Sequence, residues 1–409
     1  MGRDGALWSD VARLFASMTP SEPYRCHIFL VPGFFGFADL GDVRYFAHVE
    51  RFLRDALRAR GVEPRLHMAR VPPTGSLTRR AAALAEEIAA ADPRIEDVHL
   101  VGHSTGGLDA RLLCAPGVEL PTDVPVEPIA ARVRSVIAVA TPHRGTPMAA
   151  WFQSRLGQPL LRLVSAATLR VIQLGGVPRK PLLRLLRALK PTSSLAGLDG
   201  GLLDSIYRDI LRDFGPDSRE QLSRFFAEVT TDTALMAQLG PQAMDLFNAK
   251  ATARDGVRYG SVVTRARPPS LRGMVKAGLR PGMQGTYALY QLLYRISGAW
   301  TPADVHDSLM QRRTLEAAYG DLPDPTANDA IVPTRSQVYG KVLRAVWSDH
   351  LDVIGHFSGA RLDPPHHDWL HTRSQFGRPG FEAVWADVAD FALGVQPRRT
   401  SRGPRPVRP

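Results

Sequence analysis

The stretch Val98-His99-Leu100-Val101-Gly102-His103-Ser104-Thr105-Gly106-Gly107-Leu108 decides the fold. An apolar, β-branched run ends at Gly102, Ser104 follows after one intervening residue, and two glycines open an amphipathic helix at Leu108. This is the G-x-S-x-G pattern with a strand before it and a helix after it. The turn between them is sharp and strained, so the glycines on both sides of the serine supply the minimal side chains that it needs. The pattern predicts a nucleophilic hydroxyl at Ser104, next to the N–H groups at the start of the helix.

Strands and helices alternate on both sides of this stretch. Apolar or alternating runs predict strands over residues 24–31, 65–71, 98–102, 135–140 and 257–263. Helical periodicity predicts helices over 44–60 and 77–91. The alternation predicts an α/β fold with an open, mostly parallel sheet flanked by helices. In such a sheet the active residues lie at the carboxyl ends of the strands.

The strand pattern stops between residues 149 and 254, where the chain is helical and rich in leucine. An insertion of this length between two strands is typical of a cap or lid. We therefore expect five segments: an N-terminal helix and link (1–23), the first part of the core (24–148), a helical cap or lid (149–254), the second part of the core (255–395) and a disordered, Arg/Pro-rich tail (396–409).

One segment of the expected lid, residues 179–190, has a separate character. On a helical wheel its five leucines share one side, and the other side carries Lys180, Arg184, Arg187 and Lys190. A basic amphipathic helix of this kind can lie in the interface of a membrane or lipid droplet. Alternatively, its leucine face packs on the sheet domain and its charges are solvated. The sequence leaves both interpretations open.

The net charge of the chain is +11, from 51 basic and 40 acidic side chains. Most of the basic residues are arginines, and five of them lie in the tail at positions 398, 399, 402, 405 and 408. No nucleic-acid recognition motif accompanies this charge, so we expect no nucleic-acid partner. The sequence does not indicate an oligomeric state.

Few features of the sequence indicate where in the cell the protein is located. No run is long and apolar enough to span a bilayer, and residues 1–5 begin no signal-peptide pattern. We therefore expect a cytoplasmic protein, with secretion by a route that needs no signal peptide as the alternative. The two cysteines, Cys26 and Cys114, are too few for a disulfide framework, and we expect buried free thiols.

A candidate acid and a candidate base follow late in the chain. Asp329 stands in a loop directly before an apolar segment, and His350 stands in a later loop. A serine hydroxyl needs an imidazole to take its proton, and the imidazole needs a carboxylate that fixes its tautomer. The order Ser104, Asp329, His350 is that of the α/β-hydrolase fold.

Other residues compete for these roles. Asp321 and Asp324 are alternatives for the acid, but both flank prolines and resemble turn carboxylates. The alternatives for the base are His356, His366, His367 and His371. Residues 363–371, with three histidines and two aspartates, also suggest a metal site, although a polar surface loop is the favoured interpretation. We expect His103 and His143 to be structural.

A second loop completes the expected site. Pro32-Gly33-Phe34 follows the first strand and precedes the serine turn in the chain. Hydrolases of this kind hold the developing oxyanion with two backbone N–H groups, one from a glycine-containing loop and one after the nucleophile. We assign these donors to the N–H groups of Phe34 and Thr105.

Taken together, these residues resemble the bacterial triacylglycerol lipases of the Pseudomonas and Burkholderia type. The resemblance covers most of residues 27–157, then Tyr259, Asp329 and the surroundings of His350. It is carried by Val-Pro-Gly-Phe-Phe-Gly at 31–36, the serine turn at 101–111, Thr-Pro-His-Arg-Gly at 141–145 and Ser-Asp-His-Leu-Asp at 348–352. It departs from the family at Pro32, where a histidine is usual, and at Thr105, which is often glutamine.

The resemblance has two implications. It implies hydrolysis of long-chain acylglycerols under a helical lid, by Ser104 with His350 and Asp329. It also implies a structural calcium, because the family's ligand two residues after the catalytic histidine matches Asp352. Asp307 is a candidate for another carboxylate ligand, whereas the family's glutamine ligand aligns with His356, a poor calcium ligand. No other cofactor is implied.

The function expected from the sequence is therefore the hydrolysis of lipid-like carboxylic esters through an acyl-enzyme. An esterase or acyltransferase that acts on soluble acyl groups is the alternative within the same chemistry. The alternative from another class is a non-catalytic α/β-hydrolase-fold protein that binds lipid or membrane.

Overall fold

The computed structural model describes residues 25–34, 45–91, 97–154, 157–174, 200–217, 219–220, 222–223, 227, 232–270, 281–299, 307–359 and 365–395. The N-terminal segment 1–23, the basic helix predicted over 179–190 and the tail 396–409 lie outside the described residues.

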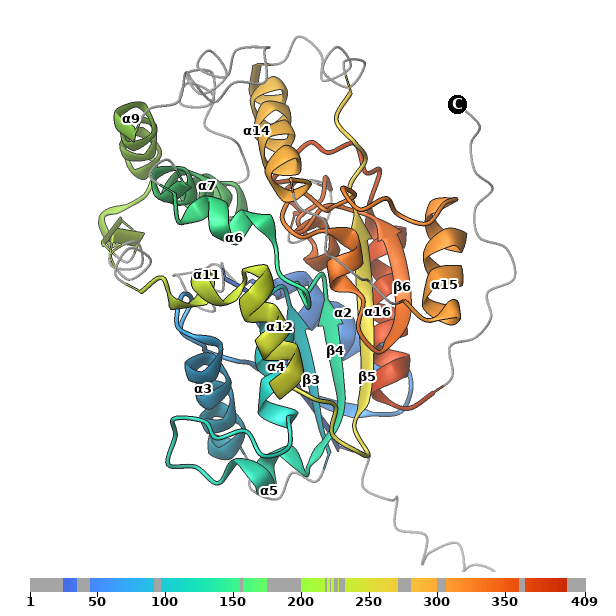
Figure 1. Ribbon diagram of the computed structural model, residues 1–409. Helices are drawn as coiled ribbons and strands as arrows, with labels where there is room; N and C mark the ends of the chain where they lie inside the picture. The colour runs from blue at the N-terminus through green and yellow to red at the C-terminus, as the bar shows by residue number, and fades with distance from the viewer. Residues whose placement is uncertain are drawn as a thin grey trace, which may run out of the picture.

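The described residues form one six-stranded sheet in which every paired strand is parallel to its neighbour (Figure 1). Its strands are β1 (Arg25–Val31), β2 (Glu63–Met68), β3 (Val98–His103), β4 (Val133–Val139), β5 (Arg258–Arg265) and β6 (Lys341–Trp347), in the order β2-β1-β3-β4-β5-β6. The predicted α/β-hydrolase class, a mostly parallel sheet flanked by helices, is confirmed.

The sixth strand is not among those predicted from the sequence. β6 pairs with β5 only, so it forms one edge of the sheet. Lys341 is exposed and most of the other residues of the strand are half-buried, with Arg344 in the middle. An edge strand of this kind lacks the continuous apolar run that predicts a strand buried on both faces.

The strand order reverses between β1 and β3. The chain passes from β1 to β2 on one side and returns to place β3 on the other side of β1. At the carboxyl ends Val31 pairs with Gly102, and His103 pairs with Val139 of β4. Ligands of open α/β sheets bind in the crevice at such a reversal. Pro32-Gly33-Phe34 directly follows the end of β1, and Ser104 directly follows the end of β3, so both lie at this reversal.

Helices cover both faces of the sheet (Figure 1). On one face α2 (Ala47–Arg58) packs on α16 (Arg378–Ala392); on the other, α3 (Leu77–Ala90) packs on α4 (Gly106–Cys114) with α5 (Val126–Ala130) beside them. α4 begins at Gly106, and all nine of its residues are buried. The helix predicted after the serine turn is present, but no side of it faces solvent as an amphipathic helix would require. Its polar residues are buried as well, Asp109 against Arg80 of α3 and Arg111 against Asn248. Cys26 and Cys114 are buried free thiols, as predicted.

Between β4 and β5 the described residues form helices and no strand. These are α6 (Pro147–Phe152), α7 (Gly157–Leu174), α9 (Gly200–Leu211), α11 (Ala234–Gln238) and α12 (Pro241–Lys250). α6 contacts α7, α11 and the later helix α14 (Pro281–Ser297), and α7 contacts α9. Figure 1 shows α6, α7, α9 and α14 beyond the carboxyl ends of the strands. A last helix, α15 (Leu309–Tyr319), packs beside β6.

Candidate active site

Ser104 stands in the strained turn between β3 and α4. Its φ of 55° is in the left-handed region, which non-glycine residues rarely adopt. The turn leaves no room for side chains: a Cβ at Gly102 would lie 2.3 Å from the carbonyl carbon of Gly106, and one at Gly106 would lie 2.2 Å from Val31 O. The glycines are therefore needed for close approach of main chains, as the sequence predicted, rather than for positive φ.

The loop after β1 passes directly over this serine. A Cβ at Gly33 would lie 2.5 Å from Ser104 Cβ and 3.1 Å from Ser104 Oγ. Phe34 follows at once and is buried. Thr105 is the N-cap of α4, a position whose N–H has no acceptor within the helix. The structure thus brings Phe34 and Thr105, the two predicted oxyanion donors, to the same cavity as Ser104.

A buried arginine ties this loop to the serine helix. Arg80 and Asp109 are fully buried and form an ion pair at 2.7 Å. The same guanidinium donates to Pro32 O at 2.8 Å and to Pro72 O at 2.7 Å. Arg80 of α3 therefore joins α4 to the loop that carries Phe34. This residue was not identified from the sequence, where it is one of many arginines.

Asp329 and His350, 21 positions apart, meet at the carboxyl ends of β5 and β6. His350 Nδ1 donates to Asp329 Oδ2 at 2.9 Å, and His350 N donates to Asp329 O at 3.1 Å. Asp329 Oδ2 also accepts from Thr264 Oγ1 at 2.7 Å, while Oδ1 accepts from Val332 N at 2.7 Å. Both residues are buried, and every donor to the carboxylate other than His350 is a neutral group. This arrangement holds the imidazole with Nε2 as its free nitrogen.

Ser104 and His350 line one narrow cavity. No hydrogen bond joins the Ser104 hydroxyl to the His350 ring, both of which belong to the described part of the chain. Such contacts are often long before a substrate binds. The rest of the lining is almost wholly apolar and comes from the β1 loop, α6, α11 and the Asp329 loop: Phe34, Met148, Ala149, Phe152, Met236, Leu239, Ile331 and Val332.

The competing acids and bases lie elsewhere. The Asp321 and Asp324 side chains are more than half exposed and face Arg265 at 2.8 and 3.7 Å. The buried His356 ring donates to the carbonyl of Tyr45, and His371 is paired with Asp368 at 2.9 Å. None of these side chains is bonded to Asp329 among the described contacts.

The histidines expected to be structural are both buried. His103 is bonded to Tyr45 and to the carbonyl of His350. His143 lies against Arg111, with 3.1 Å between Nδ1 and Nη1, and stacks on Tyr339.

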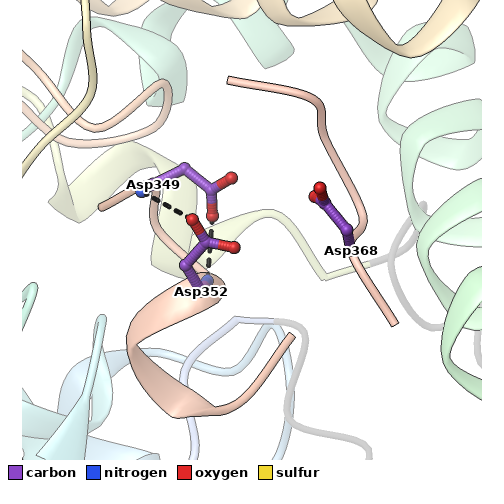
Figure 2. Close-up of side chains that lie close together, drawn as sticks. All are labelled: Asp349, Asp352 and Asp368. Carbon is purple, nitrogen blue, oxygen red and sulfur yellow. Dashed lines mark hydrogen bonds between the residues drawn. The ribbon is translucent and has the colours of Figure 1, made fainter. Parts of the chain in front are cut away.

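Three aspartates gather beside the His350 loop, and Figure 2 shows them together. Asp349, Asp352 and Asp368 each place a carboxylate oxygen within 4.8 Å of the others. Asp349 Oδ1 accepts from the N–H groups of Leu351 and Asp352 at 3.0 and 2.9 Å. Asp349 Oδ2 is buried and has no hydrogen-bond donor. Burial and the neighbouring carboxylates raise the pKa of Asp349 and of Asp352 well above their ordinary value.

The donor set of this cluster fits a calcium ion. Ca²⁺ takes carboxylate oxygens, and one buried oxygen of Asp349 has no other partner. Asp352, the predicted ligand, belongs to the cluster. Asp307 does not; its carboxylate is fully buried and paired with Arg335 at 3.0 Å. Asp349 was not identified as a ligand from the sequence, although it stands directly before the predicted base. Asp368 belongs to the segment 363–371, for which a metal site was the less favoured interpretation.

The segment favoured as a polar surface loop is only partly that. His366, Trp369 and Leu370 are buried, and Trp369 Nε1 donates to Asp349 Oδ1 at 2.8 Å. The expectation is wrong for these three residues, because Trp369 and Leu370 join the main hydrophobic core and His366 packs against Phe381 of α16. Asp363 lies outside the described residues.

None of the described helices combines the length and the apolar character that crossing a membrane requires.

No protein-family model and no curated protein matches the chain. Solved structures to which it is similar include a metagenomic carboxyl esterase (17% identity, TM-score 0.45, 90% of this chain and 76% of that chain). Others are lipase 1 from Pelosinus fermentans (15%, 0.47, 90% and 98%) and the Staphylococcus hyicus lipase (16%, 0.45, 92% and 97%). These similar structures are lipases and esterases at low sequence identity, and the more specific resemblance to the Pseudomonas and Burkholderia lipases stays a prediction.

Proposed function

We propose that the chain is a serine ester hydrolase that cleaves carboxylic esters of lipid-like molecules through an acyl-enzyme. The observation that carries the proposal is the hydrogen bond between Asp329 and His350, at the edge of a cavity that Ser104 also lines. A serine nucleophile, an imidazole and a buried carboxylate are the three groups that acyl transfer needs.

In the first step Ser104 Oγ attacks the ester carbonyl carbon and His350 Nε2 takes the hydroxyl proton. Asp329 stabilises the resulting imidazolium through the bond to Nδ1. The carbonyl oxygen becomes an oxyanion, which the N–H groups of Phe34 and Thr105 hold. Collapse of this intermediate breaks the bond to the alcohol, which leaves with the proton from His350. Water then attacks the acyl-enzyme by the same sequence and releases the acid.

The cavity lining supports an apolar acyl group. Around Ser104 the walls are formed by side chains such as Met148, Phe152 and Leu239, and among the described residues no acidic or basic one lines the cavity apart from the candidate base His350. An acyl chain that enters this cavity buries its methylenes, each of which contributes about 0.8 kcal/mol. A charged or strongly polar acyl group would lose its hydration there without compensation.

A calcium ion is part of the proposal as a structural group. Asp349, Asp352 and Asp368 would hold it. The ion would neutralise three neighbouring carboxylates and so stabilise the segment that carries His350, without taking part in the reaction.

The test is hydrolysis of p-nitrophenyl esters from acetyl to palmitoyl, with the Ser104→Ala protein measured alongside. We expect kcat of the variant to fall about 10⁵–10⁶-fold on every ester that the wild type cleaves. A fluorophosphonate should label the wild type and not the variant.

The outcomes separate the alternatives. Equal activity of wild type and Ser104→Ala on every ester contradicts the enzyme proposal. Activity confined to acetyl and butyryl esters contradicts the lipid-like substrate and leaves a soluble-ester hydrolase.

A further inference from the structure

A buried chain of hydrogen bonds links four segments of the candidate site: the loop after β1, the serine turn, the base loop and the acid loop. The proposed mechanism does not use it. The Gly33 N–H donates to the hydroxyl oxygen of Tyr45. Tyr45 Oη lies 2.6 Å from His103 Nδ1, and His103 Nε2 lies 2.9 Å from the carbonyl oxygen of His350. His350 N then donates to Asp329 O at 3.1 Å.

The direction of each bond follows from its partners. A carbonyl oxygen only accepts, so His103 Nε2 carries the ring proton. A neutral imidazole has one N–H, which leaves Nδ1 as an acceptor for the Tyr45 hydroxyl. Tyr45 Oη therefore donates to the ring and accepts from Gly33. Burial of His103 lowers its pKa well below the ordinary value, in keeping with a neutral ring.

Each link is placed where a displacement would reach the reacting atoms. Gly33 precedes the oxyanion donor Phe34, and His103 precedes Ser104. The carbonyl that His103 holds belongs to His350 itself, and the two rings have centroids 4.7 Å apart. Tyr45 and His103 are almost fully buried, so water does not replace a broken link.

We infer that Tyr45 and His103 are positioning residues, which hold the oxyanion loop and the base loop at a fixed separation across Ser104. They touch no reacting atom. This inference rests on the proposed function and adds two residues to it. Their loss lowers the rate of the acyl-transfer steps more than substrate binding, because oxyanion and proton contacts tighten in the transition state.

The first test is Tyr45→Phe, which keeps the ring and removes the hydroxyl that serves both Gly33 and His103. We expect kcat on the best p-nitrophenyl ester to fall about ten- to a hundredfold, with KM changed less than about threefold. The matched control is Tyr259→Phe, which removes a hydroxyl that accepts from Arg254 N at 3.0 Å at the opposite end of the sheet.

The second test separates the two bonds of His103. In His103→Gln the amide reaches toward the position of Nε2, so it retains a donor for the His350 carbonyl and loses the acceptor for Tyr45. We expect its kcat to lie between those of wild type and Tyr45→Phe, because the bond between Gly33 and Tyr45 is kept in this variant and lost in the other. A His103→Gln protein as active as wild type contradicts a role for the Tyr45 link.

A spectroscopic readout is independent of turnover. In ¹⁵N-labelled protein at neutral pH, the His103 ring should show the neutral Nε2–H tautomer. An Nδ1–H tautomer, or exchange between the two, overturns the inference even if no ester is cleaved. In an active enzyme, kcat/KM of Tyr45→Phe within twofold of wild type, or an equal loss in Tyr259→Phe, overturns it as well.

Discussion

Buried carboxylates lie on two sides of the His350 loop, and the two sites differ in the partners that their oxygens find. Asp329 is alone, and donors such as Thr264 and Val332 satisfy both of its oxygens besides the bond to His350. Asp349, by contrast, has two further carboxylates close by and one buried oxygen without a donor. A single carboxylate can stay ionised inside a protein when hydrogen bonds replace its hydration. Three together need protons or a cation.

The difference separates a catalytic from a structural use of the same residue type. The surroundings of Asp329 satisfy its carboxylate oxygens with hydrogen bonds and aim one of them at an imidazole. Asp349, Asp352 and Asp368 lie close together, and among the described contacts His371 is their one basic partner, bonded to Asp368, an arrangement that suits an ion and not proton transfer. Substitutions that remove one carboxylate or its partner at a time test this contrast.

Among the carboxylate substitutions, Asp329→Asn is expected to lower kcat the most. The amide removes the charge that stabilises the His350 imidazolium and can present a donor where Nδ1–H already donates. We expect kcat for ester hydrolysis to fall about 10⁴-fold while the fold is retained. Steady-state kinetics and far-UV circular dichroism check this. A loss of less than tenfold would assign the acid role elsewhere.

A further buried carboxylate, Asp109, extends the comparison because it is paired with a guanidinium, that of Arg80. Arg80→Met leaves Asp109 and the carbonyl of Pro32 buried without their partner. We expect the free energy of unfolding to fall by about 3–5 kcal/mol, measured by urea denaturation. The control is Arg58→Met, which breaks an exposed ion pair with Glu63 and should leave the midpoint unchanged. Equal midpoints for the two variants would contradict the structural role of Arg80.

The acidic cluster should make stability depend on calcium and pH. Since folding raises the pKa of Asp349 and Asp352, the native state binds more protons than the unfolded state above the ordinary pKa of 3.8. Its contribution to stability therefore falls as pH rises, and Ca²⁺ restores it at neutral pH. We expect Ca²⁺ at a hundred times its Kd to add about 2.7 kcal/mol. Thermal unfolding in EDTA and in calcium measures this.

Asp349→Asn isolates the cluster in that experiment. In EDTA at pH 8 it should be more stable than wild type, and the difference should disappear as pH falls toward 4. It should also lose most of the stabilisation by calcium. A wild-type Tm that calcium leaves unchanged, together with no pH-dependent difference between the two proteins, would refute the ion-site interpretation.

The smallest expected effect is on Asp321→Asn. This carboxylate is the sequence competitor of Asp329, yet it is largely exposed and faces Arg265. We expect kcat/KM within about twofold of wild type, because an exposed ion pair contributes little and Asp321 does not contact His350. A loss comparable to that of Asp329→Asn would reverse the assignment of the acid.

The core of the fold was predictable because its signals are local. The serine turn needs glycines at fixed spacing, and the buried parallel strands are continuous apolar runs that any one window reveals. β6 failed this test because an edge strand is only half-buried and carries Lys341 and Arg344. The burial of α4 was not predictable either, because the sequence of a helix does not show whether its polar face will pack on another helix, here α3, or be exposed to water.

The sequence by itself determined the chemical inventory: a strained serine, a loop donor before it, and an aspartate and a histidine in the order of an α/β-hydrolase. Only the tertiary structure decided which aspartate meets the histidine and which ones meet one another, because these are contacts between distant loops at one edge of a sheet. It also determined the structural roles of Tyr45, Arg80 and His103, which connect the loops of the candidate site. Their partners are main-chain carbonyl and amide groups or side chains far along the chain, and no residue pattern indicates them.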